Sequence, residues 1–414
     1  MRTILVRMLI LSAIVLLIPS LVGCSSDRGQ VSRSAQTDPP SGEDTSGTEI
    51  EAASDEASPA TALLDDPGFR PIGGFTTDFS RATVRPDEII SGGPPKDGIP
   101  AVDEPRFITV EEADDWLGSS EPVFAVSADG ETKLYPVQIL MYHEIVNDVV
   151  GETPVTVTYC PLCNSGLVFL RDFDGRVFDF GTTGRLRLSN LVMYDRQTES
   201  WWQQATGEGL VGAYAGFRLE LYPMLMLPWD RARERFQGAS VLSRETGHSR
   251  PYGNNPYAGY DTSERPFLYN GPRTSGPYAA LDRVLSVVRG GQSAAFGYPE
   301  LAEKLVVQRN VGGDPIVVMW EEGTASALDS RSIREGRDVG TANAFIARVD
   351  SRTLTFEAAG GEIRDVETGT TWDASGAATR GVLKGRSLEP AVGVQRFWFS
   401  YSAFERDGRW EPLE

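Results

Sequence analysis

The chain has 414 residues, of which 40% are hydrophobic and 23% charged, and its formal net charge at pH 7 is −19. This length is ample for two folded domains. The strongly negative charge argues against nucleic acid as a partner and against adhesion to anionic lipid.

The first 24 residues have the pattern of a bacterial lipoprotein export signal. Arg2 and Arg7 precede an apolar run over 8–22, and Leu21-Val22-Gly23-Cys24 resembles the sequence that is cut before an acylated cysteine. The run is shorter than the roughly 20 residues of a spanning helix, so we expect cleavage and lipidation at Cys24. An uncleaved signal anchor is the alternative. The mature protein is then expected to be extracytoplasmic and held at the cell membrane by its lipid.

Residues 25–65 are predicted to be a disordered acidic linker. They are rich in Ser, Thr, Asp, Glu, Ala and Pro and contain hardly an aromatic residue. Such a composition buries too little apolar surface to offset chain entropy. Beyond the linker we expect two β-rich repeats, at 66–250 and 251–414.

The repeats are inferred from matched spacings between 100–245 and 265–406. Asp195, Thr198 and Trp202 in the first stretch correspond to a second Asp-x-x-Thr-x-x-x-Trp pattern that begins at Asp365. Glycines, Tyr-Pro and Val-Gly pairs also recur at matching positions. A self-similar spacing of this kind indicates duplication. The second copy lacks the cysteines, because Glu321 stands where Cys160 is expected.

Within a copy the pattern is mostly strand. A short helix is predicted at 109–117, and 155–159 alternates apolar and polar residues. Segments 166–170 and 176–180 are predicted to form a hairpin across Asp174-Gly175, a strong turn signal. A second helix is predicted at 228–237. The expected fold class is mainly β, a β-rich α+β arrangement of two homologous tandem domains.

The sequence Tyr-Cys-Pro-Leu-Cys-Asn at 159–164 contains the only thiols beyond residue 24. It follows a strand and precedes another, which argues against a thioredoxin-like site, where the first cysteine begins a helix. His143, one of two histidines in the chain, lies shortly upstream. An imidazole and two thiolates suit zinc or copper. We therefore predict a metal ion at His143, Cys160 and Cys163.

Other side chains are assigned to the surroundings of this ion. Met193 is a possible thioether ligand that favours copper, although it also fits a core position. Glu144 and Asp148 are candidates to orient the imidazole, and Asn190 to bind polar groups. Lys96 and Asp97 lie in a Gly/Pro-rich loop that is a candidate cover for the site. Each of these residues also has a purely structural explanation.

Four blocks resemble the signature of a known family. They are 90–100, 135–148, 157–165 and 188–198, among them Met-Tyr-His-Glu-Ile-Val-Asn-Asp and Val-Thr-Tyr-Cys-Pro-Leu-Cys-Asn-Ser. They look like the prokaryotic domain-of-unknown-function family 3179, and the resemblance spans roughly 75–406. It implies that the four blocks form one site. It implies no reaction.

Three functions from different classes remain open. The first is an envelope-anchored lipoprotein that binds copper or zinc. The second is a thiol/disulfide oxidoreductase in which Cys160 attacks and Cys163 resolves the disulfide. The third is a non-catalytic interaction module. No nucleotide cofactor is expected, because neither a phosphate loop nor a Rossmann glycine pattern is convincing.

Overall fold

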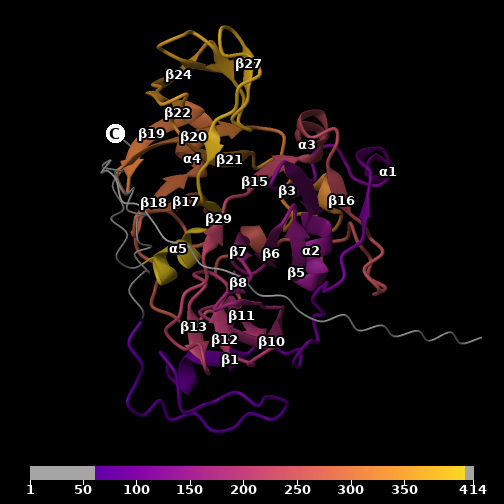
Figure 1. The fold of residues 1–414 in the computed structure, drawn as a ribbon, viewed down its shortest axis with the longest axis vertical. Coiled ribbons are helices and arrows are strands. Elements are labelled where there is room, and N and C mark those ends of the chain that lie inside the picture. Colours follow the sequence, from indigo (N-terminus) through magenta and orange to yellow (C-terminus); the bar gives the residue numbers. More distant parts are fainter. Residues whose placement is uncertain (1–60, 406–414) are drawn as a thin grey trace, which may run out of the picture. The chain divides into compact units, whose positions relative to one another are not determined.

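The computed structural model describes residues 61–405, and these consist mainly of strands joined by short turns (Figure 1). The prediction of a mainly β protein is confirmed. The predicted signal sequence, Cys24 and nearly all of the predicted linker lie outside the described residues. No helix within 61–405 is long and apolar enough to cross a membrane.

Elements up to residue 242 follow in this order: η1 (Pro86–Glu88), β1 (Ile89–Ser91), β2 (Phe107–Ile108), α1 (Val110–Asp114), β3 (Pro122–Ala128), β4 (Glu131–Pro136), α2 (Val137–His143), β5 (Ile145–Val150), β6 (Thr153–Cys160), β7 (Ser165–Leu170), β8 (Asp172–Phe173), β9 (Arg176–Val177), β10 (Phe180–Arg187), β11 (Asn190–Asp195), β12 (Trp201–Gln203), β13 (Gly209–Val211), β14 (Leu221–Tyr222), β15 (Leu225–Pro228), α3 (Trp229–Arg235) and β16 (Ser240–Leu242).

The remaining elements are η2 (Tyr260–Thr262), β17 (Arg283–Arg289), β18 (Gln292–Gly297), α4 (Tyr298–Lys304), β19 (Val306–Val311), β20 (Asp314–Glu321), η3 (Ile333–Glu335), β21 (Thr341–Ile346), β22 (Arg348–Val349), β23 (Arg352–Thr353), β24 (Phe356–Ala359), β25 (Glu362–Asp365), β26 (Thr371–Trp372), β27 (Ala378–Arg380), β28 (Glu389–Pro390), β29 (Gly393–Phe397) and α5 (Trp398–Phe404).

The two halves have the same strand pairing. The sheet β14-β7-β6-β5 of the first half has the counterpart β28-β21-β20-β19 in the second, and β10 to β13 pair in order as β24 to β27 do. Strands β15, β3 and β4 pair as β29, β17 and β18 do. The sheets β10–β13 and β24–β27 lie at opposite ends of the described part (Figure 1).

The repeated Asp/Thr/Trp spacing corresponds to one local structure that occurs twice. Asp195 accepts hydrogen bonds from the Thr198 backbone N–H at 2.6 Å and from Trp202 Nε1 at 2.9 Å. Asp365 accepts from the threonine and tryptophan at the same spacing, at 2.6 and 3.0 Å. In both halves the carboxylate accepts hydrogen bonds from a backbone N–H of the turn and from a buried indole N–H. The repeated spacing in the sequence therefore corresponds to the same turn in each half.

Several local predictions are confirmed. Thr109 begins α1, where its hydroxyl accepts from the Glu112 N–H at 3.2 Å, as an N-cap does. Helix α3 lies within the predicted 228–237. Asp174 and Gly175 form the predicted turn, with φ of 51° and 70°, but the hairpin they close joins the short strands β8 and β9, because 166–170 pairs with β6 and β14 instead. Helix α2 was not predicted. All but one of its residues are buried, so it has no amphipathic stripe to reveal it.

The two halves are packed into each other. All described residues fall in one compact unit, and the hydrophobic cluster around the cysteines also contains Val394, Phe397 and Phe399 of the second half. A second cluster, to which both halves contribute equally, packs Val317 and Phe345 of the second half with residues of the first. Strand β29 contacts β7. The described residues are therefore two repeats with shared cores rather than two separate domains.

Candidate functional site

The two cysteines lie at the ends of the tight turn that joins β6 to β7. Cys160 is the last residue of β6, and Asn164, with φ of 48°, returns the chain into β7. Both thiols are free and almost fully buried, with exposures of 1% and 0%. Their sulfurs lie 3.9 and 3.5 Å from the same Ser189 carbonyl oxygen. The turn thus brings both sulfurs to one point.

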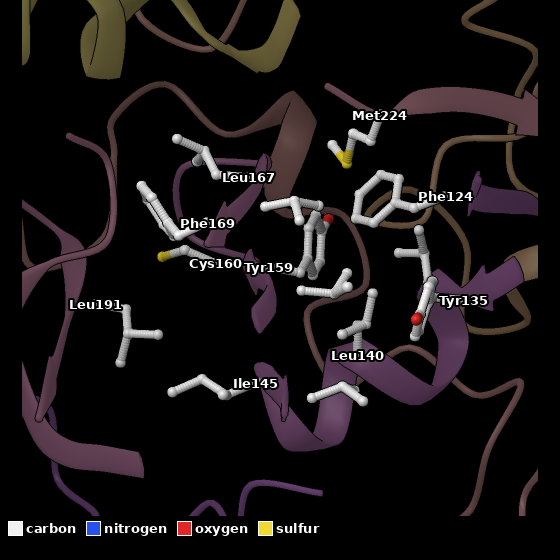
Figure 2. Packing of buried hydrophobic residues seen from close by; sticks show 14 of the residues in the cluster. Phe124, Tyr135, Leu140, Ile145, Tyr159, Cys160, Leu167, Phe169, Leu191 and Met224 are labelled. Atoms are coloured by element: carbon white, nitrogen blue, oxygen red, sulfur yellow. The ribbon is translucent and has the colours of Figure 1, made fainter. Parts of the chain in front are cut away.

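Apolar side chains enclose the first sulfur. Figure 2 shows Cys160 pointing toward Leu191 and Phe169, whereas Tyr159 points the other way, toward Phe124. This alternation is that of strand β6, whose successive side chains face opposite sides of the sheet. Cys160 is therefore enclosed by the hydrophobic core.

The second half supplies the polar groups on the other side of the pair. The Phe397 N–H donates to the Cys163 carbonyl at 2.9 Å. This bond places Arg396, at the end of β29, and Ser400, in α5, beside the turn. Their exposures are 1% and 0%. Among the described residues, Arg396 Nε and Nη1 have no hydrogen-bond partner of normal geometry.

The buried Arg396 guanidinium forms an ion pair with Glu405. Glu405 lies 3.5 Å from Arg396 Nη1, too poorly aligned for a hydrogen bond. The Cys163 sulfur and the Tyr401 hydroxyl also interact electrostatically with this guanidinium. A buried cation is costly unless it is compensated. Arg396 therefore favours a negative charge on Cys163.

The two thiols differ in acidity. Burial raises the pKa of Cys160 well above its ordinary value, and the neighbouring Cys163 sulfur raises it further. Burial acts to raise the pKa of Cys163 too, but hydrogen bonds from Cys160, Ser400 and Asn190 and the charge of Arg396 together bring it below its ordinary value. Cys163 is therefore the more acidic of the two thiols.

The Ser189 carbonyl acts against this assignment. It lies closer to the Cys163 sulfur than to the Cys160 sulfur, a position that suits an S–H donor at Cys163. One carbonyl dipole nevertheless opposes a full positive charge and several donors. Charge-assisted interactions are about twice as strong as neutral ones. We therefore infer that Cys163 ionises more readily than Cys160.

The Asn190 amide is held in place by a buried network. Its oxygen accepts from Gln203 Nε2 at 2.6 Å and from the Ala205 N–H at 2.9 Å, and its nitrogen donates to Gln204 Oε1 at 2.7 Å. Gln204 in turn donates to the Thr158 hydroxyl at 2.9 Å. These contacts fix which end of the amide is the donor. Asn190 can therefore present its N–H₂ group to Cys163.

A segment between the two halves covers the turn. The Tyr260 hydroxyl donates to the Leu162 carbonyl at 2.8 Å and accepts from the Phe267 N–H at 3.2 Å. The Ser189 hydroxyl donates to the Phe267 carbonyl. This segment closes the cysteine turn from the side that the sheets leave open.

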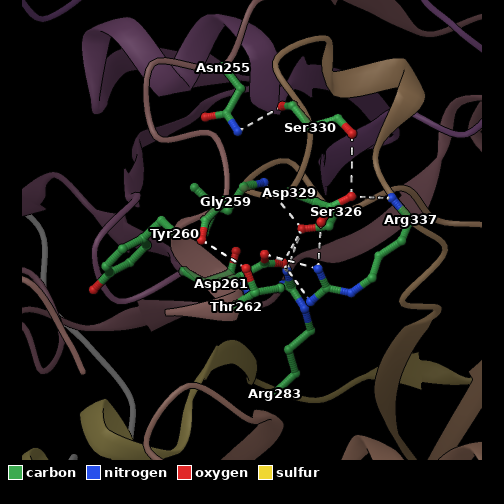
Figure 3. A network of polar contacts seen from close by, with 12 residues as sticks. Asn255, Gly259, Tyr260, Asp261, Thr262, Arg283, Ser326, Asp329, Ser330 and Arg337 are labelled. Atoms are coloured by element: carbon green, nitrogen blue, oxygen red, sulfur yellow. Dashed lines mark hydrogen bonds and ion pairs between the residues drawn. The ribbon is translucent and has the colours of Figure 1, made fainter. Parts of the chain in front are cut away.

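The residue after Tyr260 anchors this segment to the second half. In Figure 3, Arg283 and Arg337 converge on Asp261. The distances from their nitrogens to Asp261 Oδ2 are 2.8 and 2.9 Å. Ser326 donates to the same oxygen at 2.5 Å. Arg337 also donates to Asp261 Oδ1 at 3.1 Å. The Asp261 side chain is 0% exposed, and these four polar contacts compensate its burial.

His143 is a buried residue with both ring nitrogens occupied. Nδ1 lies 2.7 Å from the Pro100 carbonyl oxygen and Nε2 lies 2.6 Å from the Tyr252 hydroxyl. A carbonyl only accepts, so Nδ1 carries the proton and Nε2 accepts from Tyr252. Burial lowers the pKa of His143 to about 4, although the Pro100 hydrogen bond acts in the opposite direction. His143 is thus neutral at pH 7.

The structure brings only some of the predicted site residues together. Asn190 reaches Cys163, and Met193 is buried in the same hydrophobic cluster as both cysteines. The Glu144 carboxyl is buried close enough to Cys160 for the two to influence each other, and burial raises its pKa well above the ordinary range. Asp148 instead accepts from Tyr135 at 2.6 Å and pairs with a lysine.

Lys96 and Asp97 belong to a different cluster. Lys96 pairs with Glu199, and Asp97 accepts from the Tyr194 hydroxyl at 2.5 Å and from Arg196 at 3.2 Å. Tyr194 follows Met193 in β11, so the two side chains point to opposite faces of the sheet. The loop that contains Lys96 and Asp97 therefore covers the face away from Met193.

Within 61–405, no group of three or more His, Cys, Asp or Glu side chains is arranged to hold a metal ion. His143 and the two cysteines are therefore not gathered into one ligand set there. The remaining donors fit a metal only as a pair of sulfurs. Two thiolates suit a soft ion such as copper(I) better than zinc, which takes four ligands in structural sites.

Sequence reasoning did not find Arg396, Ser400 or Tyr260 as part of this site. They come from the second repeat and the segment before it, more than ninety positions along the chain from the cysteines. The sequence signal for Arg396 is only indirect: a buried arginine needs a counter-charge, and this need points to a site only once the burial is known. Nothing in the local pattern around Arg396 distinguishes it from the chain's many surface arginines.

The fold and this site define a mainly β protein with a repeated topology, in which one half presents a buried cysteine pair to an arginine of the other. The sequence model of the DUF3179 family, described as proteins of unknown function, matches residues 96–408. The chain therefore belongs to the DUF3179 family. No curated protein and no solved structure matches it.

Proposed function

We propose that Cys160 and Cys163 are a redox-active dithiol that cycles to a disulfide. The observation that supports this proposal is that the buried Arg396 and several hydrogen-bond donors interact with Cys163, one of two adjacent buried thiols. Purely structural buried cysteines have a raised pKa and are inert. Cys163 departs from that pattern.

The electrostatics favour Cys163 as the nucleophile, because the thiolate is the reactive form. Cys160, with its raised pKa, then acts as the resolving thiol. This order is the reverse of the one expected from the sequence. Forming the disulfide removes two electrons and two protons from the pair, and an external thiol reductant returns them.

The test is a redox titration of the full-length protein extracted in mild detergent. After equilibration in glutathione buffers of varied ratio, free thiols are blocked with one alkylating agent and disulfide thiols, once reduced, with another. Mass spectrometry of the peptide with both cysteines then reports its oxidised fraction. We expect reversible two-electron oxidation. A pair that stays reduced in every buffer until the protein is unfolded would overturn the proposal.

The second candidate function is the binding of copper(I). It is supported by the position of both sulfurs beside the Ser189 carbonyl and by Met193 in the same hydrophobic cluster. These donors suit copper(I), whose complex with two thiolates has a single negative charge that Arg396 would balance. Copper(I) competition with a colorimetric chelator tests this. Stoichiometric binding that is lost in the Cys160→Ser/Cys163→Ser variant, without redox cycling of the native protein, would favour it over the dithiol.

We further propose that Cys24 carries the lipid that holds the protein at the cell membrane, outside the cytoplasm. The support is the sequence pattern of 1–24 alone. An extracytoplasmic location suits a thiol pair that is oxidised in its working cycle.

A further inference from the structure

The two repeats end in the same order of elements. In the first repeat, β15 leads into α3, and β16 then adds to β4 as a parallel strand. In the second, β29 leads into α5, which begins with a tryptophan as α3 does. Strand β18, the counterpart of β4, pairs only with β17 within 61–405 and lies at the edge of its sheet (Figure 1). The described part of the second repeat therefore has an open edge where the first repeat has β16.

The chain leaves helices α3 and α5 in the same conformation. Phe236, the C-cap of α3, has φ of −118° and ψ of 55°, and its N–H donates to the Ala232 carbonyl at 2.9 Å. Glu405, the C-cap of α5, has φ of −107° and ψ of 47°, and its N–H donates to the Tyr401 carbonyl at 2.9 Å. Two dihedral angles per residue set the path of a backbone. The chain beyond Glu405 therefore starts along the path that takes the chain beyond Phe236 to the edge of β4.

The second repeat also lacks one member of an apolar cluster that is complete in the first. In the first repeat, the side chains between β16, α3 and the neighbouring sheet include Val123, Leu134, Trp229, Ala232 and Val241. In the second repeat, the equivalents of the first four also pack together, and they are Val284, Ala295, Trp398 and Tyr401. Strand pairing and position within the helices establish this match. Val241 of β16 is the member without a counterpart among the described residues.

We propose that residues 406–414 of this chain add to the edge of β18 and close the second repeat as β16 closes the first. Trp410 then takes the place of Val241, because the two stand equally far beyond the ends of their helices, at Phe404 and Arg235. An extended segment on a free edge gains backbone hydrogen bonds and a contact for every second side chain. This inference does not depend on the dithiol function.

The sizes of the side chains agree with this assignment. Val241 pairs with Leu134 in the first repeat. The counterpart of Leu134 in β18 is Ala295, which is smaller and leaves room for the larger indole of Trp410. Protein interiors are close-packed, so a smaller side chain on one strand is matched by a larger one on its neighbour. Pro412 then ends the pairing, because proline has no N–H to donate and is confined to edges.

A tethered segment has an advantage over a strand from another molecule. Trp410 is separated from Glu405, next to α5, by only a few residues, so its effective concentration at β18 is on the order of mM. A second copy or another protein would have to displace it. Open strand edges also favour aggregation, and the segment removes this one. The occupant of the edge is therefore 406–414 of the same chain.

The docked segment also fixes one side of the cysteine turn. Helix α5 contacts β17, and Glu405, which follows α5, pairs with Arg396 at 3.5 Å. Arg396 precedes Phe397, whose N–H donates to the Cys163 carbonyl. The segment therefore holds Glu405 in place beside Arg396, whatever reaction the cysteines carry out.

Hydrogen exchange of the full-length protein in mild detergent, read by mass spectrometry of peptic peptides, tests this edge. In the wild type, the amides of β18 that face away from β17 should also be protected, because the segment covers them. Trp410→Ala should speed their exchange at least about 100-fold, the scale of truncating a buried tryptophan. Arg409→Ala is the matched control, with unchanged exchange, because successive side chains of a strand face opposite sides. Fast exchange of these amides in the wild type, or protection that Trp410→Ala leaves unchanged, overturns the proposal.

A photo-cross-link identifies the occupant without relying on the stability of the alanine variant. With p-benzoylphenylalanine in place of Trp410, irradiation should join 406–414 to the peptide that contains Ala295, in a product of monomer mass. The same group in place of Val382, which is 82% exposed, is the control and should not give this product. Adducts confined to a second copy or to another protein overturn the proposal, as does the absence of an adduct to β18 in the folded variant.

Discussion

The Asp261 network should be the strongest single electrostatic contribution to the stability of the described part. Its carboxylate is 0% exposed and pairs with Arg283, whose side chain is 11% exposed, and with the half-exposed Arg337. Asp261→Asn leaves Arg283 buried without its counter-charge. Breaking a buried pair costs about 3–5 kcal/mol. Because Arg337 is partly screened by solvent, we expect the lower end, about 3 kcal/mol.

This loss is large enough to measure by denaturation. Unfolding entropy is about 2.1 cal/mol/K per residue, which over 61–405 amounts to roughly 0.7 kcal/mol/K. A loss of about 3 kcal/mol therefore lowers the Tm by roughly 4 °C. Urea unfolding at pH 7 gives the same quantity as a shift in midpoint.

The control is Asp350→Asn, which removes the carboxylate of another Asp–Arg pair. Asp350 and its partner Arg386 are 63% and 54% exposed, and exposed pairs contribute about 0.2–1 kcal/mol. The pKa of Asp261 is also held below its ordinary value, because its arginines and Ser326 outweigh burial. Its contribution is therefore complete above the unfolded value near 3.9 and is lost as the pH falls through the lower folded value. Equal losses in the two variants at pH 7 would refute this reasoning.

Two further predictions concern His143 and the anchor. The pKa of His143 is lowered by burial to about 4 in the folded protein, so between pH 6.5 and 4 the unfolded chain binds a proton that the folded chain does not, and stability must fall as the pH falls. In His143→Gln this part of the pH dependence should be missing from urea midpoints measured between pH 7 and 4.5, and a variant with the wild-type slope would contradict the burial argument. For the anchor, Cys24→Ser should move the protein from the membrane to the soluble fraction or leave it unprocessed, as read from fractionation and the mass of the N-terminal peptide; continued acylation and membrane retention would count against it.

The features that could be predicted from the sequence are those set by neighbours in the chain. Alternation at 155–159, the Asp174-Gly175 turn and the Thr109 cap depend on residues a few positions apart, and each was found where expected. The matched Asp195 and Asp365 patterns belong to the same class, because each carboxylate bonds within its own turn. The cysteine turn itself was also placed correctly between two strands.

The partners of the site were decided by tertiary structure alone. His143 was expected beside the cysteines because it is near them in sequence, but α2 ends there and directs the imidazole to Pro100 and Tyr252. Arg396 reaches the turn only because β29 of one repeat packs on β7 of the other. No spacing rule links residues so far apart, since their contact depends on how two repeated sheets bury each other's faces. The local sequence specifies the strands and turns of each half, and only the packing of the two halves determines which side chains meet at the sulfurs.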